Sequence, residues 1–436
     1  MFESLRILSH YFDARRLDRE SSRRRLLEHQ FRQFEHLREA LRRSPFYRDY
    51  ASRPPTEWPM VDKAAWMANF DAINTAGIRL RDAEQVALSA ERDRSFNVDL
   101  RGVTVGLSTG TSGARGIFLA SEAERRRWAG AILAKLLPKG LLQRERIALV
   151  LRADSRLYGT VASGRWMQFG YLDSTRPIDE VAESLVRFSP TVLVGPPSVL
   201  RALATSTDIA SRLSVRRVVC GAEVLDDTDR ALLHRAFDAP VAQVYQATEG
   251  FLGASCSHGS IHLNEEYVHV EPQWLDAART RFVPVITDLY RHTQPVVRYR
   301  LNDVLTVASM PCPCGKASLA IDRIEGREDD VFWLPAIERS RGAVPIFADA
   351  LSRAIVTSGA SIQDYEIVQT GRTRWRVAVH PAPDADTCKL LSEGLQRCAH
   401  RGGAVSPQID VGELTISALT PHKRRRVRRE WRGHAA

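Results

Sequence analysis

Residues 103–137, VTVGLSTGTSGARGIFLASEAERRRWAGAILAKLL, combine a β-branched run, a loop of glycine, serine and threonine, and an amphipathic stretch. The first run predicts a strand and the last a helix, with the loop LSTGTSGARG (107–116) directly between them. Glycines and hydroxyl groups let such a loop close around phosphate oxygens. The loop is therefore predicted to bind phosphate, and the alternative is an ordinary flexible turn. It has neither the lysine of a G-x-x-x-x-G-K-[ST] loop nor the spacing of G-x-G-x-x-G.

The alternation of strand-like and helix-like segments continues to about residue 246. Apolar runs rich in valine and isoleucine predict strands, and longer segments with apolar residues at helical spacing predict helices. Strands are expected at 146–151, 191–195, 215–221 and 241–246, and helices at 179–188, 197–204 and 227–237. Such strand–helix units predict a mostly parallel sheet covered by helices, the arrangement of an α/β protein.

The later part of the chain changes character twice. Between about 262 and 310, β-rich segments follow one another with no helix between them, which predicts a β-rich subdomain. The polar segment IDRIEGREDDVF (321–332) then precedes a small α+β region. Its last strand is expected at ELTISAL (413–419), before the basic run HKRRRVRR (422–429).

Charge and composition exclude several classes of protein. The 436 residues include 62 Lys+Arg and 52 Asp+Glu, and the excess of positive charge lies in residues 1–50 and 421–436. Residues 16–45 predict one long amphipathic helix that ends at Ser44-Pro45. The body of the chain has no net charge, so we do not expect a nucleic-acid partner. No apolar run approaches the ~20 residues of a membrane helix, and no secretory signal pattern is present, so a cytoplasmic protein without membrane insertion is expected.

Two polar motifs follow predicted strands. VYQATEG (244–250) places Tyr245, Thr248 and Glu249 at a strand end, where parallel sheets bind ligands. An aromatic ring can stack on a base, a hydroxyl can donate to a phosphate, and a carboxylate can bind Mg²⁺. In TDLYRHTQPVVRYRLNDV (287–304), Asp303 follows a strand and can accept hydrogen bonds from the hydroxyls of a ribose. Either motif alone is also compatible with an ordinary strand end.

The six cysteines do not have the density of a secreted disulfide framework. Cys256, His258 and His262 are followed about 50 residues later by Cys312-x-Cys314. Three cysteines and one histidine can complete a tetrahedral structural Zn²⁺ site, with His262 as the preferred fourth ligand and His258 as the alternative. Buried free thiols are the other interpretation.

Taken in order, five motifs resemble those of the adenylate-forming (ANL) superfamily. They are STGTSGARG (108–116), CGAEVL (220–225), YQATEG (245–250), PVVRYRLND (295–303) and IEGREDD (324–330). The branch that the chain resembles most is the phenylacetate–CoA ligase and coenzyme F390 synthetase-like group. The resemblance covers almost the whole chain. It implies an N-terminal helical segment of the large domain (1–90), an adenylation core with the β-rich subdomain (91–328) and a small mobile α+β C-terminal lid (329–436).

The same resemblance implies roles for individual residues. Lys423, Thr248 and Glu249 would be catalytic, with Glu249 binding Mg²⁺ and Lys423 supplying the cation that stabilises charge during adenylation. ATP or AMP would be bound by Ser108, Thr109, Gly110, Thr111, Ser112, Gly113, Gly221, Ala222, Glu223, Tyr245, Gln246, Ala247, Asp303 and Arg327. Asp329 and Asp330 would form the hinge of the small domain. Gln246 departs from the glycine that much of the superfamily has there, and Lys423 is also compatible with an exposed basic tail.

These roles imply a ligase that uses ATP and Mg²⁺ to convert a carboxylic acid into an acyl-adenylate. The acyl group would then pass to the pantetheine thiol of CoA or of an acidic acyl carrier protein. An aromatic acid such as a hydroxybenzoate or phenylacetate is the expected substrate by resemblance. Two alternatives remain: AMP transfer to a hydroxyl acceptor, as in an F390 synthetase-like nucleotidyltransferase, and a basic-tail binding module without catalysis.

Overall fold

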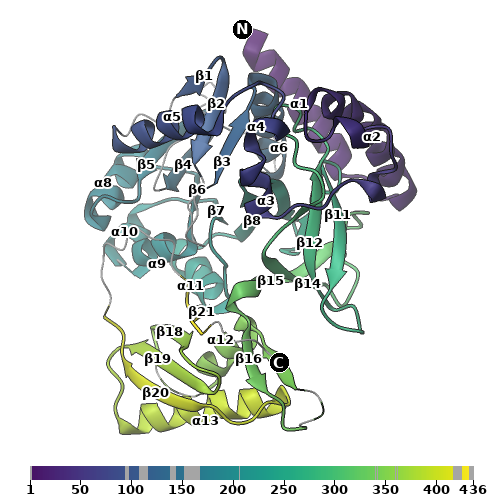
Figure 1. Ribbon diagram of the computed structural model, residues 1–436. Coiled ribbons are helices and arrows are strands. Elements are labelled where there is room, and N and C mark those ends of the chain that lie inside the picture. The colour runs from purple at the N-terminus through teal and green to yellow at the C-terminus, as the bar shows by residue number, and fades with distance from the viewer. Residues whose placement is uncertain are drawn as a thin grey trace. The chain divides into compact units, whose positions relative to one another are not determined.

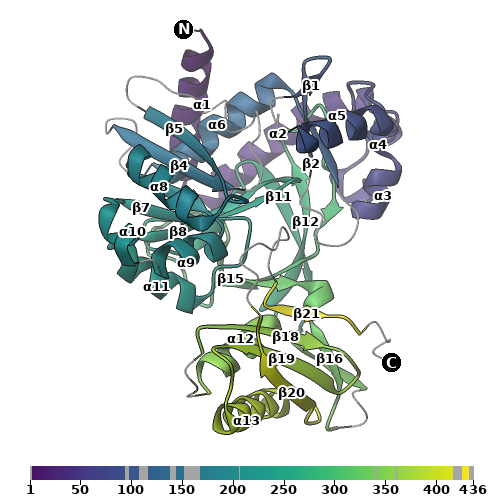
Figure 2. The same cartoon turned by 90° about the vertical axis from the view of Figure 1, so that its left-hand side faces the viewer.

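The computed structural model describes residues 2–93, 98–107, 116–137, 144–151, 167–205, 207–338, 340, 342–358, 360, 362–415 and 425–431. The chain forms two compact units (Figures 1 and 2). The large unit comprises Met1–Leu301 and Thr306–Arg323, and the small unit comprises Asn302–Leu305 and Ile324–Ala436. Within the described ranges, we find no helix with the length and apolar character needed to cross a membrane.

A twelve-stranded sheet contains most strands of the large unit. Its order is β11-β12-β14-β15-β10-β9-β8-β7-β6-β4-β5, and β13 pairs with β12. The strands are β4 (Glu145–Leu151), β5 (Met167–Asp173), β6 (Val192–Gly195), β7 (Arg217–Cys220), β8 (Val241–Ala247), β9 (Gly250–Ser255), β10 (Ile261–Leu263), β11 (Val268–Trp274), β12 (Arg281–Asp288), β13 (Tyr299–Arg300), β14 (Asp303–Val307) and β15 (Ala320–Arg327). Neighbours among β5, β4, β6, β7 and β8 are parallel, whereas β8–β9 and β9–β10 are antiparallel pairs. The predicted β-rich segment therefore continues the parallel sheet.

Helices pack on the parallel half of the sheet. They are α8 (Ile178–Phe188), α9 (Pro197–Thr205), α10 (Thr207–Arg212) and α11 (Asp227–Phe237). The spacing of Val181 and Leu185 places both on one helix face, and they join a buried core with Leu193 and Val218 from the strands. The α/β fold class expected from the sequence is confirmed.

The N-terminal region holds two helices where one was predicted. Residues 16–45 were expected to form a single helix, but α1 (Phe2–Asp18) ends before α2 (Arg23–Arg43) begins. Ser22 causes the break, because its hydroxyl accepts the backbone N–H of Arg25 (3.4 Å) and caps α2. The short elements that follow are η1 (Arg48–Tyr50), η2 (Pro55–Glu57), α3 (Lys63–Ala68), α4 (Phe70–Ile73) and α5 (Leu80–Arg92).

Helix α1 packs closely on α6 (Glu122–Leu136). A Cβ atom at Gly130 of α6 would lie 2.6 Å from the Cβ atom of His10, so the contact requires glycine. The ammonium group of Lys135, also on α6, bonds to the carboxylates of Asp18 and Glu266, the latter at 2.6 Å. Asp18 also bonds to Lys316 at 2.6 Å. A buried ion network therefore ties α1 and α6 to the segment before β11.

The predicted phosphate loop lies in a different setting from the one expected. Strands β1 (Asp99–Leu100), β2 (Val103–Leu107) and β3 (Ile117–Ala120) form a small antiparallel sheet, in which Leu107 pairs with Ile117. The segment that follows β2 thus leads to β3 and not directly to a helix, because the apolar run Ile117–Ala120 forms a strand. Residues 108–115 themselves lie outside the described ranges.

The small unit has its own core. It contains β16 (Phe332–Pro335), β17 (Ala343–Ile346), α12 (Ala348–Val356), β18 (Asp364–Gln369), β19 (Arg374–His380), α13 (Ala385–Arg401), β20 (Gln408–Glu413) and β21 (Val427–Arg429). The last four strands form a sheet in the order β20-β19-β18-β21. Strand β20 (Gln408–Glu413) runs parallel to β19 and includes only the first residue of the strand predicted at 413–419. Residues 416–419 of that prediction lie outside the described residues.

Part of the basic run is structured. Residues 427–429 form β21, parallel to β18, and the side chain of Val427 is buried in the core. Arg425 bonds to Asp330, Arg426 to Asp364 and Arg428 to Glu366. These arginines are therefore partly neutralised within the small unit, so residues 425–429 do not form the exposed tail that the sequence left open as an alternative.

Candidate functional site

The carboxyl ends of β6, β7 and β8 bring two of the predicted motifs to one edge of the sheet. Gly195 at the end of β6 pairs with Cys220 at the end of β7, and the backbone N–H of Gly221 donates to the carbonyl of Gly195 (3.1 Å). A Cβ atom at Gly221 would lie 2.9 Å from Val244 of β8. The segments CGAE and VYQATEG are therefore neighbours at the edge where parallel sheets bind ligands.

The turn after β7 is held by local contacts. Ala222 adopts a left-handed backbone conformation with φ of 67°, which is uncommon for a residue with a side chain. The carboxylate of Glu223 accepts the backbone N–H of Ser198 (3.2 Å) in the first turn of α9. This bond fixes the turn against the start of the next helix, and it leaves the backbone of 221–223 at the sheet edge.

Thr248 and Glu249 form the two-residue turn of the β8–β9 hairpin, in which Ala247 pairs with Gly250. The hydroxyl of Thr248 donates to a carboxylate oxygen of Glu249 (2.9 Å). Glu249 is half-buried and forms no ion pair with any residue that the structure describes. Its carboxylate therefore offers oxygen atoms of the kind that Mg²⁺ prefers.

Arg291 supports this turn and was missed by the sequence analysis. Its guanidinium donates to the carbonyl of Thr248 and to the carbonyl of Leu119 (3.0 Å). It also contacts the side-chain oxygen of Gln294 (3.3 Å). The motif at 287–304 drew attention only to Asp303. Arg291 lies in the same motif, but the spacing of its residues does not show which distant carbonyl an arginine contacts.

A buried carboxylate lies under the same hairpin. A Cβ atom at Gly250 would lie 3.1 Å from a carboxylate oxygen of Asp288, and Asp288 accepts the backbone N–H of Tyr290 (2.9 Å). Burial raises the pKa of Asp288 to about 6, and the nearby Arg291 only partly opposes this effect. Its charge state therefore changes close to neutral pH.

Gln246, the position that departs from the superfamily pattern, links two elements. Its side-chain oxygen accepts the indole N–H of Trp128 on α6 (3.0 Å), and its amide donates to the carbonyls of Ala247 and Gly250. A glycine at this position would form none of these bonds. Tyr245, beside it, has a buried side chain on β8.

The other predicted residues belong to the small unit or lie outside the described ranges. Asp303 is the first residue of β14, and Arg327 is the last residue of β15. Asp329 accepts a hydrogen bond from the Asn302 side chain, and Asp330 is buried and paired with Arg425. Ser108–Gly113 and Lys423 lie outside the described residues. Their roles and the hinge remain predictions.

The four preferred ligands of the predicted metal site converge in the large unit. The ligand atoms of Cys256, His262, Cys312 and Cys314 all lie within 4.8 Å of one another, and His258 is not in the cluster. The sulfur atoms of Cys256 and Cys312 are 3.6 Å apart, too far for a disulfide, and Cys314 lies 3.2 Å from Nε2 of His262. Two ligands of a tetrahedral Zn²⁺ with bonds of ~2.3 Å are ~3.8 Å apart, so the spacing suits this ion.

The surroundings of the cluster favour metal binding. Nδ1 of His262 lies 3.1 Å from the carbonyl of Ser318, which orients the ring and leaves Nε2 facing Cys314. Burial by itself would raise the pKa of Cys312, but hydrogen bonds with Ser260 and Cys314 lower it to about 5, whereas burial and the neighbouring thiols raise the pKa of Cys314 to about 11. A thiolate is the form of cysteine that binds metals.

Comparison with known proteins supports the fold. No protein-family model and no curated protein matches the sequence. Among solved structures, 2-hydroxyisobutyryl-CoA ligase in the postadenylation state with R3-HIB-AMP has a TM-score of 0.68 at 18% identity, over 94% of this chain and 90% of that one. The chain therefore shares the fold of this ligase.

Two further structures agree. The same ligase in an open conformation with 2-HIB-AMP and CoA has a TM-score of 0.58 at 16% identity, over 91% of this chain and 90% of that one. The amide bond synthetase McbA from Marinactinospora thermotolerans has a TM-score of 0.50 at 16% identity, over 73% of this chain and 66% of that one. At these identities the likeness concerns the fold.

Proposed function

We propose that this chain is an ATP-dependent acid–thiol ligase. It activates a carboxylic acid as an acyl-adenylate and then transfers the acyl group to the pantetheine thiol of CoA or of an acyl carrier protein. The observation that carries the proposal is the meeting of CGAE (220–223) and YQATEG (245–250) at the carboxyl edge of β6, β7 and β8. The fold shared with a ligase whose structures contain an acyl-AMP and CoA supports it.

The residues of this edge suit a nucleotide and its metal. Backbone groups of 221–223 flank the adenine, and Thr248 contacts the α-phosphate or the acyl-adenylate. Glu249, without an ion-pair partner among described residues, would hold Mg²⁺. The ion would supply positive charge that stabilises the phosphate oxygens during attack. Arg291 keeps the Thr248 carbonyl, and with it the turn, in a fixed position.

The chemistry explains why ATP is needed. A carboxylate is a poor acyl donor, whereas a mixed anhydride with AMP has a good leaving group. The carboxylate oxygen attacks the α-phosphorus and pyrophosphate leaves; a thiol sulfur then attacks the acyl carbon and AMP leaves. Lys423 supplies the cation for the first step in this proposal, and Asp329 and Asp330 form the pivot of the small unit. Asp303 holds the ribose.

The acid is proposed to be aromatic, such as a hydroxybenzoate or a phenylacetate. The support is the resemblance of the ordered motifs to the phenylacetate–CoA ligase branch. The test must nevertheless include aliphatic acids, because the solved ligase with the same fold is named for the 2-hydroxyisobutyryl group, which is aliphatic.

Carboxylate-dependent ATP–pyrophosphate exchange tests the proposal. We expect exchange with at least one aromatic acid, and a loss of about 100-fold or more in Glu249→Gln and in Lys423→Ala. Glu84→Gln and Lys389→Ala are matched controls, because both side chains are exposed and lie on helices α5 and α13. Absence of exchange with every aromatic and aliphatic acid would contradict acid activation and direct attention to AMP transfer to hydroxyl acceptors.

We also propose that Cys256, His262, Cys312 and Cys314 hold a structural Zn²⁺. Three sulfurs and one nitrogen fill a tetrahedral site, so no position is open for catalysis. We expect about one zinc per chain by elemental analysis and its loss in Cys312→Ser, whereas Cys388→Ser on α13 keeps it. Equal zinc content in both variants would show that the cluster is a set of free thiols.

A further inference from the structure

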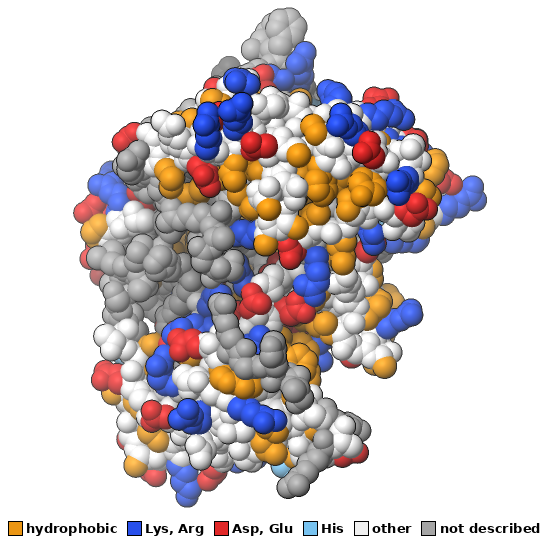
Figure 3. Space-filling view, viewed as in Figure 1, with side chains coloured by type: hydrophobic (Ala, Val, Ile, Leu, Met, Phe, Trp, Pro, Cys, Tyr) orange, Lys and Arg blue, Asp and Glu red, His pale blue; other side chains and the backbone are white. Residues whose placement is uncertain are grey.

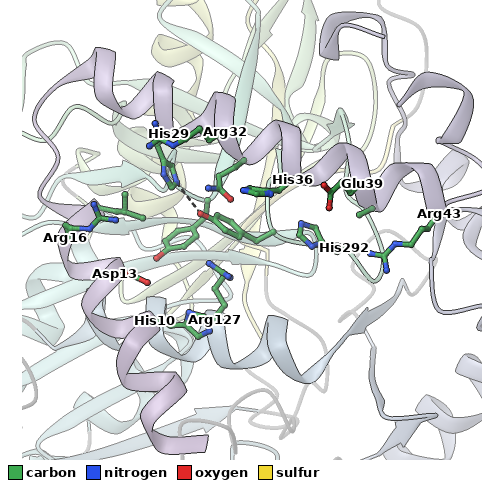
Figure 4. Close-up of a pocket in the computed structure, with 15 residues that line it drawn as sticks. His10, Asp13, Arg16, His29, Arg32, His36, Glu39, Arg43, Arg127 and His292 are labelled. Carbon is green, nitrogen blue, oxygen red and sulfur yellow. Dashed lines mark hydrogen bonds between the residues drawn. The ribbon is translucent and has the colours of Figure 1, made fainter. Parts of the chain in front are cut away.

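A polar cavity lies in the large unit (Figure 4), and none of the residues that line it belongs to the sheet edge described above. It is lined by α1, α2, α6 and residues of the segment 267–292, and its volume is about 550 Å³. Four arginines, four histidines and two acidic residues face it. Only Leu17 and Ala40 are aliphatic, so the cavity does not suit an acyl chain.

The positive charge of the cavity is not neutralised internally. Arg16, Arg32 and Arg43 form no ion pair with any residue in the described ranges. The two acids that line the cavity, Asp13 and Glu39, likewise form none there. Since four guanidinium groups face two carboxylates, the cavity carries net positive charge at neutral pH.

The fourth arginine is held in place by an aromatic ring. The guanidinium of Arg127, on α6, lies 4.2 Å from the centre of the Tyr290 ring. The Tyr290 hydroxyl in turn contacts Nε2 of His29 at 3.2 Å, the bond drawn in Figure 4. This stacking orients the planar guanidinium of Arg127 and leaves its N–H groups available as hydrogen-bond donors.

A buried nitrogen in the wall has no partner. Nε2 of His292 is shielded from solvent and forms no hydrogen bond with any described residue. Burial, together with neighbouring arginines, lowers the pKa of His292, so its ring is neutral at pH 7. A buried nitrogen of this kind is costly unless a ligand or water bonds to it.

We propose that this cavity binds a small phosphate-bearing anion. Guanidinium groups match the geometry of phosphate oxygens through pairs of N–H donors, and the unpartnered Nε2 of the neutral His292 ring can accept the O–H of a protonated phosphate oxygen. The arginines come from α1, α2 and α6, so three helices supply the positive charge of the cavity (Figure 4). The site is separate from the one that holds ATP in the proposed function.

The cavity is linked to the sheet edge by three consecutive residues. Tyr290 and His292 line the cavity, while Arg291 between them donates to the carbonyl of Thr248. The N–H groups of His292 and Thr293 also donate to Glu124 (2.7 and 2.8 Å). An anion that orders Tyr290 and His292 therefore orders the support of the Thr248–Glu249 turn.

Calorimetric titration with inorganic phosphate and with pyrophosphate tests the proposal. We compare the wild type with the variant Arg32→Gln/Arg43→Gln, which removes two arginines of the cavity. The control is Arg25→Gln/Arg42→Gln, which removes two exposed arginines of the same helix that do not line it. Circular dichroism verifies that all three proteins are folded, as expected because these arginines are exposed.

We expect the cavity variant to bind phosphate at least about tenfold more weakly than the control. Pyrophosphate that binds at the ATP site would bind both variants equally, so only the difference between them reports on the cavity. A nuclear magnetic resonance shift of the His292 ring on adding phosphate is the second expected result. Equal affinities in the two variants, or no phosphate binding by the wild type at 10 mM (about 3 kcal/mol of binding free energy), would overturn the proposal, whatever the outcome of the exchange assay.

Discussion

Replacing Lys135 by methionine should weaken the packing of α6 against α1 and against the segment before β11. Lys135 is 5% exposed, and its partner Glu266 is 4% exposed. In Lys135→Met the Glu266 carboxylate stays buried with no cation, whereas Asp18 keeps its bond to Lys316 at 2.6 Å. Breaking a buried ion pair by removing one partner costs about 3–5 kcal/mol. We therefore expect a cost in that range for Lys135→Met.

The effect on pH dependence has a definite sign. Burial by itself would lower the pKa of Lys135, but Glu266 and Asp18 outweigh it and raise the pKa. A raised lysine pKa contributes stability below the ordinary value of 10.5, and this contribution is lost as the pH rises through the folded pKa. The wild type should therefore lose stability in strong alkali through this residue, and the variant should not.

Hydrogen exchange of the α1 and α6 amides measures the effect, because a chain with two units need not unfold in a single step. A cost of 3 kcal/mol corresponds to exchange about 100-fold faster at pH 7. Lys316→Met is the control variant. It should lower the stability by only about 1 kcal/mol, because Asp18 keeps its ion pair with Lys135. Exchange within about threefold of the wild type in Lys135→Met, or an equal cost in both variants, would refute the reasoning.

Three further predictions concern other parts of the chain. Gly130→Val should detach α1 and speed proteolysis near residues 19–22, because its side chain would overlap His10, whereas Gly412→Ala, with open space around it, should leave the rate unchanged. Asp288→Asn should raise the thermal midpoint at pH 7.5 but not at pH 4.5. Burial raises the pKa of Asp288 to about 6, so ionisation of this buried carboxyl above that pH opposes folding. An equal change in the thermal midpoint at both pH values would contradict this prediction. Val427→Asp should lower the free energy of unfolding of the small unit by about 2–4 kcal/mol, because the Val427 side chain is buried in its core. Unchanged amide hydrogen exchange in β18 would contradict this prediction.

The parallel half of the sheet could be predicted from the sequence because its strands are nearly continuous apolar runs. The segment RIALVL forms β4 and VAQVYQ forms β8, each within a residue of the expected bounds. Such strands are buried on both faces, so their composition alone identifies them. The break between α1 and α2 was missed, because the capping bond of Ser22 interrupts a pattern that otherwise continues at helical spacing.

Contacts between distant segments could not be predicted in this way. The spacing of Cys312 and Cys314 indicated a metal site, but only the pairing of β10 with β9 and β15 brings His262 beside them. Arg291 lies in the motif 287–304 and Trp128 in the predicted helix that follows the glycine-rich loop, but neither pattern reveals their partners, Thr248 and Gln246, which are more than 40 residues away. The arginines of the basic run likewise show no partner in the sequence, yet Arg425 is paired with Asp330.

The position of β21 has a consequence for how the chain is made. Strand β18 pairs with β19 immediately, but its other edge is completed by residues 427–429. At 5–20 residues per second, the ribosome needs about 3–12 s to add the roughly 60 residues between them. During that interval the open edge of β18 can pair with another nascent chain. Slowing translation between residues 369 and 427 should therefore increase co-translational aggregation.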